Sequence, residues 1–318
     1  MSFRLALLLF LLLAPPVWAE TPQLSFAEQQ RPEGLLLDYS FADRGWPRPR
    51  QLSFLLPSDV VRAGAGSYHV AGHYDPAAVT ERVKKAVEKA VPAYGADVKA
   101  TVTRASHGYE LSVQVQGRRP RLLQVMAGLK QVAAKAEAEY LAEVYLRPLR
   151  PREVVPDYGR LAGMFVAAMR PVAAALAAQL PPAAGERERL ALALAFVQSI
   201  PYDTETAARR ENGYVVPPMM LVQNKGACDS KSVTLASLLA TLLPGRASVV
   251  VLVPEHALLG VALTPAPGER TLFHDGRTYV LMEPVGPAQT PVGQVTERSA
   301  RALSRLNGAT VLPVAAAP

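Results

Sequence analysis

The chain of 318 residues contains one cysteine, Cys228, and this scarcity excludes several classes of protein. A single thiol cannot form an intramolecular disulfide, a cysteine-rich zinc site or a cysteine-ligated iron–sulfur cluster. The excess of positive charge is also small: the chain has 34 Lys and Arg and 27 Asp and Glu, which gives a net charge of +7. No run of Lys or Arg exceeds two residues, which argues against a nucleic-acid partner.

The balance of residue types is that of a folded globular protein. Hydrophobic residues make up 50% of the chain and charged residues 19%, which excludes a disordered or collagen-like chain. Glycine and proline, 21 and 28 residues, follow no period and therefore predict loops and linkers. A chain of this length has room for about two domains.

The first nineteen residues have the layout of a secretory signal peptide. Arg4 precedes an apolar run at 5–14, and small residues follow at Val17 and Ala19. The run is shorter than the ~20 residues that cross a bilayer. We therefore expect residues 1–19 to be removed and the protein to be exported, to the periplasm or beyond the cell, without an integral membrane anchor.

Proline- and glycine-rich segments between the predicted helices and strands divide the remaining chain into three parts. Residues 20–150 are predicted to form a small α+β sandwich with its helices on one sheet face. Prolines between 148 and 156 suggest a linker to a second domain at 151–288. Residues 289–318 are rich in Pro and Ala and are predicted to be a tail with one short basic helix.

The N-terminal domain is expected to contain strands, two helices and a hairpin. Asp75 and Pro76 begin the first helix, because Asp caps helix N-termini and Pro is favoured in the first turn. Strands are expected at 35–37, 52–56 and 67–71, helices from 76 to 90 and from 120 to 144, and a hairpin at 98–116.

His69 and His73 have the spacing of two metal ligands on one helix face. Glycines at 64, 66 and 72 argue against a helix there. The sequence therefore predicts no metal site, and it indicates no cofactor.

The second domain is expected to begin with helices and to continue with strands. Helices are expected at 158–179, 186–199 and 230–243, and strands at 247–253, 257–263 and 278–283.

Chemistry is concentrated around Cys228, which lies immediately before the predicted helix at 230–243. A thiol at a helix start faces unpaired backbone N–H groups, which stabilise the nucleophilic thiolate. Such a nucleophile needs a base, and the base needs an orienting group. His256 starts the second of two predicted strands and Glu283 ends the next one, so the three side chains are expected on one wall.

Alternatives remain open for the supporting residues. Asp275, beside His274 in a predicted loop, competes with Glu283 as the orienting carboxylate. Gln223 and Tyr202 are candidates to donate a hydrogen bond to the oxyanion, together with the backbone N–H of Cys228.

This part of the chain resembles the transglutaminase-like superfamily, in particular its bacterial, exported cysteine-proteinase type. The resemblance implies a papain-like core, made of a helical lobe and an antiparallel sheet, with the chain order Cys, His, acid. The segments that carry it lie between residues 190 and 285: FVQSIPYD (196–203), QNKGACDSKS (223–232), the strand start at His256 and YVLMEP (279–284).

The resemblance implies an exported, thiol-dependent acyl-transfer enzyme, a cysteine peptidase or amidase acting on peptide or protein substrates of the cell envelope. The chain departs from the family in having Ala227 where Asp is common, and Glu283 where the third member is commonly Asp. The alternative is therefore an inactive binding or scaffold module of the same fold. In that case the N-terminal domain would bind a protein partner.

Overall fold

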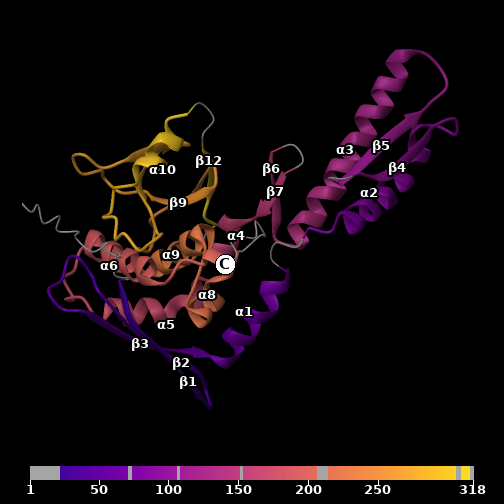
Figure 1. The fold of residues 1–318 in the computed structure, drawn as a ribbon. Helices are drawn as coiled ribbons and strands as arrows, with labels where there is room; N and C mark the ends of the chain where they lie inside the picture. Colours follow the sequence, from indigo (N-terminus) through magenta and orange to yellow (C-terminus); the bar gives the residue numbers. More distant parts are fainter. Residues whose placement is uncertain are drawn as a thin grey trace, which may run out of the picture.

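The computed structural model describes residues 22–70, 74–105, 108–150, 153–205, 214–305 and 309–315. Within this part the protein is α+β, with helices and antiparallel sheets, as the sequence predicts. The expected signal peptide lies outside the described residues. Most of the chain forms three layers, in which helices separate two sheets, and a smaller helical unit projects from one side (Figure 1).

The first layer is an antiparallel sheet near the start of the chain, formed by β1 (Gln23–Arg31), β2 (Gly34–Phe41) and β3 (Arg50–Pro57). Alternate residues of a strand point to one face, and here they are large and apolar, for example Leu37, Tyr39 and Phe41. Their burial against the central helices sets the register of the sheet.

Helix α1 (Ser58–Val70) follows β3 directly. It includes Gly64 and Gly66, so the prediction of a strand at 67–71 is wrong as far as Val70. Glycine lowers helix propensity by about 1 kcal/mol, but Gly64 is packed beside Met219 and Pro218, where a larger residue would have little room. Tertiary packing therefore overrides the local signal. The side chain of His69, and all of His73, lie outside the described structure.

The central layer consists of helices that the sequence largely predicts. The expected helix at 158–179 is broken at Phe165, where its two halves bend by 68°. Among the described residues, no unbroken helix has the length and apolar character to span a membrane, although this bent pair passes by length and composition together. The helices are α4 (Tyr158–Met164), α5 (Val166–Ala177), α6 (Glu186–Ser199), α8 (Pro217–Gln223) and α9 (Cys228–Leu242).

The third layer is a five-stranded antiparallel sheet with the order β10-β11-β9-β8-β12. One face packs on the central helices, and short α10 (Glu297–Leu303) lies over the other, where Leu303 packs against a second apolar cluster. The strands are β8 (Ser248–Val253), β9 (His256–Val261), β10 (Thr271–His274), β11 (Arg277–Met282) and β12 (Thr310–Pro313).

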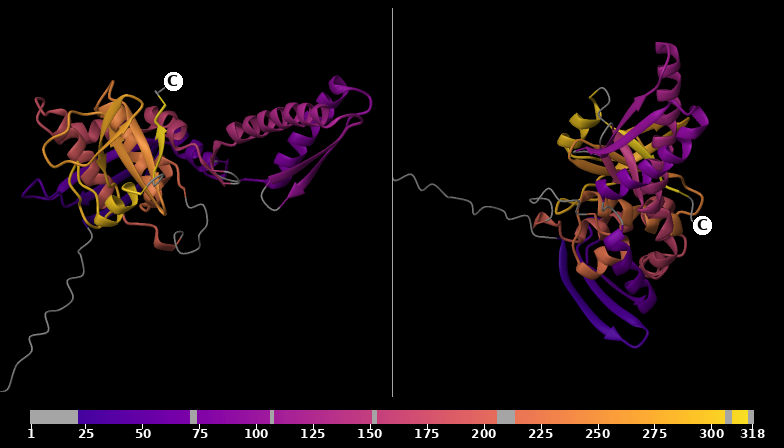
Figure 2. Two further views of the ribbon diagram at one scale, coloured as in Figure 1. Left: turned by 90° about the horizontal axis from the view of Figure 1, so that it is seen from above. Right: turned by 90° about the vertical axis from the view of Figure 1, so that its right-hand side faces the viewer.

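The projecting unit, residues 74–143, has a hydrophobic core of its own. Asp75 accepts a hydrogen bond from the N–H of Ala77 and caps the first helix, as predicted. The two helices pack on a hairpin and the unit extends away from the three layers (Figures 1 and 2). Its elements are α2 (Pro76–Ala90), η1 (Val91–Tyr94), β4 (Lys99–Ala105), β5 (Gly108–Gln114) and α3 (Arg119–Glu143).

The observed packing differs from the predicted division of the chain. Strands β1–β3 share a core with helices α4, α5, α6, α8 and α9, so residues 20–150 are not one sandwich. Two prolines of the expected linker, Pro148 and Pro156, lie in a hairpin formed by β6 (Leu146–Arg150) and β7 (Glu153–Pro156). The expected tail supplies α10, as predicted, and β12, which was missed. We call the described residues of 22–70 and 153–315 the main body.

Candidate active site

Cys228 is the first residue of α9, two positions earlier than the helix start predicted from the sequence. Gly226, two residues earlier, forms a β-bridge with Tyr202, donates its N–H to the carbonyl of Pro201 and accepts from the N–H of Asp203. A Cβ at Gly226 would lie 2.7 Å from the side chain of Met220. The turn that presents the thiol is therefore held on both sides and has no room for a larger residue.

The same turn is tied to the first sheet. Asn224 ends α8 in the left-handed conformation (φ 50°), which Asn tolerates better than most residues. Its side-chain amide exchanges hydrogen bonds of 2.7 and 3.0 Å with Gln23. The buried hydroxyl of Tyr39 donates to the carbonyl of Leu221 at 2.7 Å. Strands β1 and β2 thus support the segment that carries the nucleophile.

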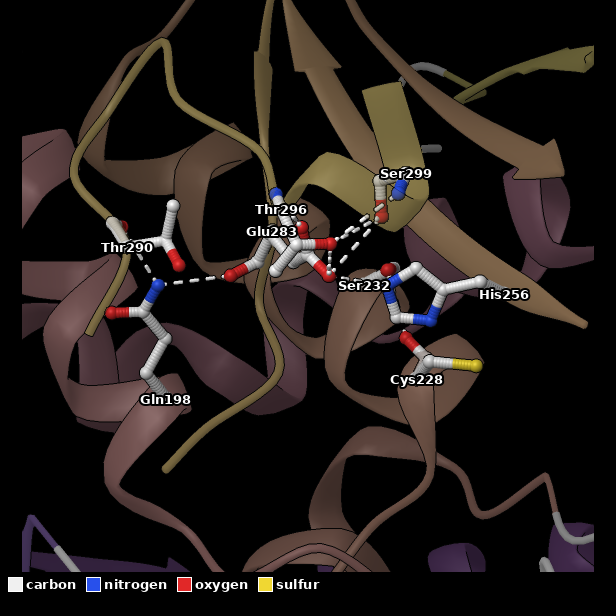
Figure 3. Close-up of polar contacts among 8 residues, drawn as sticks. All are labelled: Gln198, Cys228, Ser232, His256, Glu283, Thr290, Thr296 and Ser299. Atoms are coloured by element: carbon white, nitrogen blue, oxygen red, sulfur yellow. Dashed lines mark hydrogen bonds and ion pairs between the residues drawn. The ribbon is translucent and has the colours of Figure 1, made fainter. Parts of the chain in front are cut away.

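His256 is the first residue of β9, after a two-residue turn in which Glu255 has a positive φ of 60°. Its Nε2 lies 2.8 Å from Oε1 of Glu283. Figure 3 draws the imidazole between Glu283 and Cys228, with the second ring nitrogen, Nδ1, on the side of Cys228. The backbone N–H of the next residue, Ala257, contacts the Cys228 thiol, which confirms that the start of β9 lies against it. The structure thus joins His256 to Glu283 and places the start of β9 against Cys228.

Glu283 follows β11 and is almost fully buried. Thr296 donates its backbone N–H to Oε2 at 2.7 Å, and the Ser299 hydroxyl lies 3.2 Å from Oε1. Gln198, on α6, fixes the backbone by donating to the carbonyl of Glu283 at 2.9 Å (Figure 3). Burial alone would raise the pKa of the Glu283 carboxyl, but hydrogen bonds from His256 and Thr296 outweigh burial and lower it. The carboxylate is thus held ionised beside the imidazole.

Sequence reasoning missed Thr296 and Ser299, because they lie in the expected tail. A signal was present: Thr296 is a good N-cap residue, and it caps α10 by accepting from the N–H of Ser299. The same cap brings both residues to Glu283.

The rival carboxylate, Asp275, is at the other end of the sheet. In the antiparallel pairing, Met282 lies opposite Leu259, so the end of β11 meets the start of β9, where His256 lies. Asp275 is in the β10–β11 turn at the opposite end of β11, and its side chain is 79% exposed. It pairs with His274, which ends β10 and is not in a loop as predicted. The register therefore favours Glu283.

The pKa of Cys228 contradicts the sequence-based expectation of a stabilised thiolate. Burial, followed by the nearby charge of Asp229, raises the pKa of the thiol to about 12. Backbone N–H groups of Ala257, Asp229 and Cys228 act in the opposite direction but do not compensate. A helix N-terminus favours an anion by about 1 kcal/mol, which is less than the loss of hydration on burial. The resting group is therefore a thiol.

Asp229 is a buried carboxyl that the sequence analysis did not single out. The Tyr158 hydroxyl donates to it at 2.9 Å and the N–H of Ser230 at 2.7 Å. Burial raises the pKa of Asp229 despite these hydrogen bonds. Its protonation state therefore acts directly on the neighbouring thiol.

The two oxyanion candidates have different surroundings. Tyr202 is held next to Gly226 by a β-bridge. Burial raises the pKa of its hydroxyl, and the charges of Cys228 and Asp229 raise it further, which places Tyr202 near the nucleophile. Gln223 is exposed at the end of α8, and its side chain makes no hydrogen bond within the described part of the chain. Tyr202 is the better placed donor.

Among the described residues, no group of three or more His, Cys, Asp and Glu side chains is arranged to hold a metal ion. No protein-family model matches this chain, and neither the curated proteins nor the solved structures give a significant match. The arguments for function therefore come from the site itself.

Proposed function

We propose that this protein is a thiol-dependent acyl-transfer enzyme that hydrolyses peptide or side-chain amides, with Cys228 as nucleophile, His256 as base and Glu283 as orienting group. One observation carries the proposal: the 2.8 Å contact between His256 Nε2 and a buried Glu283, which leaves Nδ1 for the thiol at the start of α9. The resemblance of residues 190–285 to the transglutaminase-like superfamily supports the same roles. Because residues 1–19 of this protein have the layout of a signal peptide, we place the enzyme in the cell envelope.

The raised pKa of Cys228 defines the first step. His256 accepts the thiol proton while sulfur forms a bond to the amide carbonyl carbon, and the carbonyl electrons move to oxygen. The backbone N–H of Cys228 and the Tyr202 hydroxyl are the donors proposed for that oxyanion. The C–N bond then breaks and His256 returns the proton to the leaving amine. Water attacks the thioester in the same way and releases the acid and the free thiol.

The lone cysteine makes a direct test simple, because iodoacetamide incorporated into a thiol can only be on Cys228. We expect His256→Ala to slow alkylation at pH 7 by about 10²-fold or more, the usual range for a general base. Without the base, a thiol with a pKa of about 12 is ionised to roughly one part in 10⁵ at pH 7. The rate in the variant should therefore keep rising toward high pH, while that of the wild type levels off.

His274→Ala is the matched control, because it removes the other histidine of the same sheet at its far end. Its alkylation profile should equal that of the wild type. Equal profiles for His256→Ala and the wild type, with both proteins folded by circular dichroism, would contradict the proposal. Cleavage of internally quenched peptides, with and without an added primary amine, then separates hydrolysis from transamidation.

A second candidate is a binding module of this fold that has lost turnover. The observation in its favour is the raised thiol pKa, with the buried Asp229 next to the thiol. A partner would then dock on the projecting unit. This candidate predicts that His256→Ala changes neither alkylation nor the biological role.

A further inference from the structure

A pocket of about 280 Å³ lies beside His256, over the edge of the sheet where α10 packs. Its walls contain His256 and Glu255 from the β8–β9 turn, and Ser299 and three arginines from α10 and the residues after it. Ser299 also contacts Glu283. One short helix therefore supports the proposed catalytic acid and lines the neighbouring pocket.

The three arginines, Arg298, Arg301 and Arg305, are spaced three and four residues apart. This spacing places them on one helix face. Helix α10 ends at Leu303, but the N–H of Arg305 donates to the carbonyl of Ala302, so the helical turn continues to the third arginine. The pocket thus has a row of guanidinium groups along one wall.

Within the described residues, too few carboxylates lie near these three arginines to neutralise their charge. Glu255 is the one carboxylate in the pocket and lies 2.8 Å from Arg298. Arg301 has only a loose pair, 3.8 Å, with exposed Glu297, and such surface pairs contribute little. Arg305 forms no ion pair in the described part of the chain. Two guanidinium groups therefore remain available to an anion.

We infer that this pocket is a subsite for a carboxylate of the substrate, held by Arg301 and Arg305. Arginine presents N–H groups in a planar fork that matches the two oxygens of a carboxylate. The inference rests on the proposed acyl transfer in one respect, which is where the carboxylate lies in the substrate relative to the scissile bond. His256 gives its proton to the leaving amine, so a pocket that contains His256 receives the leaving-group side of the scissile bond. The substrate class is thus a peptide with an acidic residue just after that bond.

Tyr202 provides support from the other side of the site. Burial, followed by the charges of Cys228 and Asp229, raises the pKa of its hydroxyl, and Arg298 acts in the opposite direction. Arg298 therefore lies within electrostatic range of Tyr202, on the wall that holds the nucleophile.

The test measures binding without turnover, on a Cys228→Ala background. The probes are two fluorescein-labelled peptide amides, Ala-Ala-Glu-Glu-Ala and Ala-Ala-Gln-Gln-Ala, followed by fluorescence anisotropy at low ionic strength. We expect the Glu peptide to bind about tenfold more tightly, and the preference to weaken with salt. Arg301→Gln/Arg305→Gln should abolish the preference, and Glu255→Gln should increase it. A third probe, the Gln peptide with a free C-terminal acid, separates an α-carboxylate from a side-chain carboxylate.

The matched control is Arg104→Gln/Arg119→Gln, which removes two exposed arginines of the projecting unit. It should leave the preference unchanged. Equal affinity for all three peptides, or a preference that survives Arg301→Gln/Arg305→Gln, overturns the subsite. Failure of the acyl-transfer proposal is distinguishable, because it would appear in the alkylation profile and leave this binding preference in place. Faster cleavage of peptides with Glu after the scissile bond would add the leaving-group position.

Discussion

The main body and the projecting unit each have a hydrophobic core, but the two cores are connected to the candidate site in different ways. In the main body, Phe196 of α6 is fully buried against the rings of Tyr39 and Phe41, at centroid distances of 5.1 and 5.6 Å. Two residues further on, Gln198 holds the backbone of Glu283. In the projecting unit, Leu129 and Val83 are as deeply buried, but they pack only within that unit.

The difference shows how packing becomes relevant to chemistry. The first sheet is distant from Cys228 in sequence, yet it supports α6 and α8, which position the thiol turn and the acid. The projecting unit has a separate core, and none of its described residues contributes to the site. A substitution that destabilises the main body should therefore also change the reactivity of Cys228. A substitution that destabilises the projecting unit should leave that reactivity unchanged.

The largest effect that tests this comparison is expected from Phe196→Ala. Removing a buried Phe destabilises a core by about 3–5 kcal/mol, and here the loss should also reduce alkylation of Cys228. Leu129→Ala should destabilise the projecting unit by about 2–5 kcal/mol and leave alkylation unchanged. Hydrogen–deuterium exchange read by mass spectrometry resolves the two regions. Increased exchange of α9 and β9 in Leu129→Ala would show that the regions are coupled.

The second effect concerns Lys231, which is fully buried in the main body and donates to the carbonyls of Val197 and Ile200. Burial lowers the pKa of its amine to about 7. Between pH 7 and the usual lysine value the unfolded chain binds a proton that the folded chain does not. Stability from this residue therefore rises with pH in that window, by up to about 1.4 kcal/mol per unit.

Lys231→Met should remove this slope from the free energy of unfolding, measured by urea denaturation at a series of pH values. Lys135→Met is the matched control in the projecting unit, where the side chain is 81% exposed. Its pH dependence should equal that of the wild type. A slope that persists in Lys231→Met would mean that the amine stays charged when folded.

The smallest effect is expected from removing one hydroxyl in each region. Tyr39→Phe leaves the buried carbonyl of Leu221 without its donor, and should destabilise the protein by about 1 kcal/mol. Tyr109→Phe removes a longer contact, 3.3 Å to Glu137, on the half-exposed side of the projecting unit. Its effect on thermal unfolding should be smaller. Equal effects would argue that β2 does not hold the end of α8.

Local signals predicted the fold where the chain itself provides caps and periodicity. Asp75 and Pro76 start α2, and the helix at 186–199 matches α6. The strand prediction at 67–71 was wrong as far as Val70, where helix α1 continues although Gly64 and Gly66 lower helix propensity and Gly64 packs beside Met219. The joining of β1–β3 to the later helices could not be predicted, because it depends on contacts about 150 residues apart, such as Tyr39 with Phe196.

The sequence was sufficient to name the candidate residues of the site, but it did not predict the pKa of the Cys228 thiol. Cys228 was expected at a helix start, His256 at a strand start and Glu283 at a strand end, but favouring Glu283 over Asp275 required the register of β11 on β9. The raised pKa of Cys228 depends on burial and on Asp229, and neither quantity can be obtained from a helix start alone.

The cap of α10 has a consequence for how the site is completed. Both donors from this cap follow Glu283 in the chain, Thr296 by 13 residues and Ser299 by 16. A chain shortened before Thr296 would keep the acid but lose these donors, and Glu283 would be held ionised less strongly beside the imidazole.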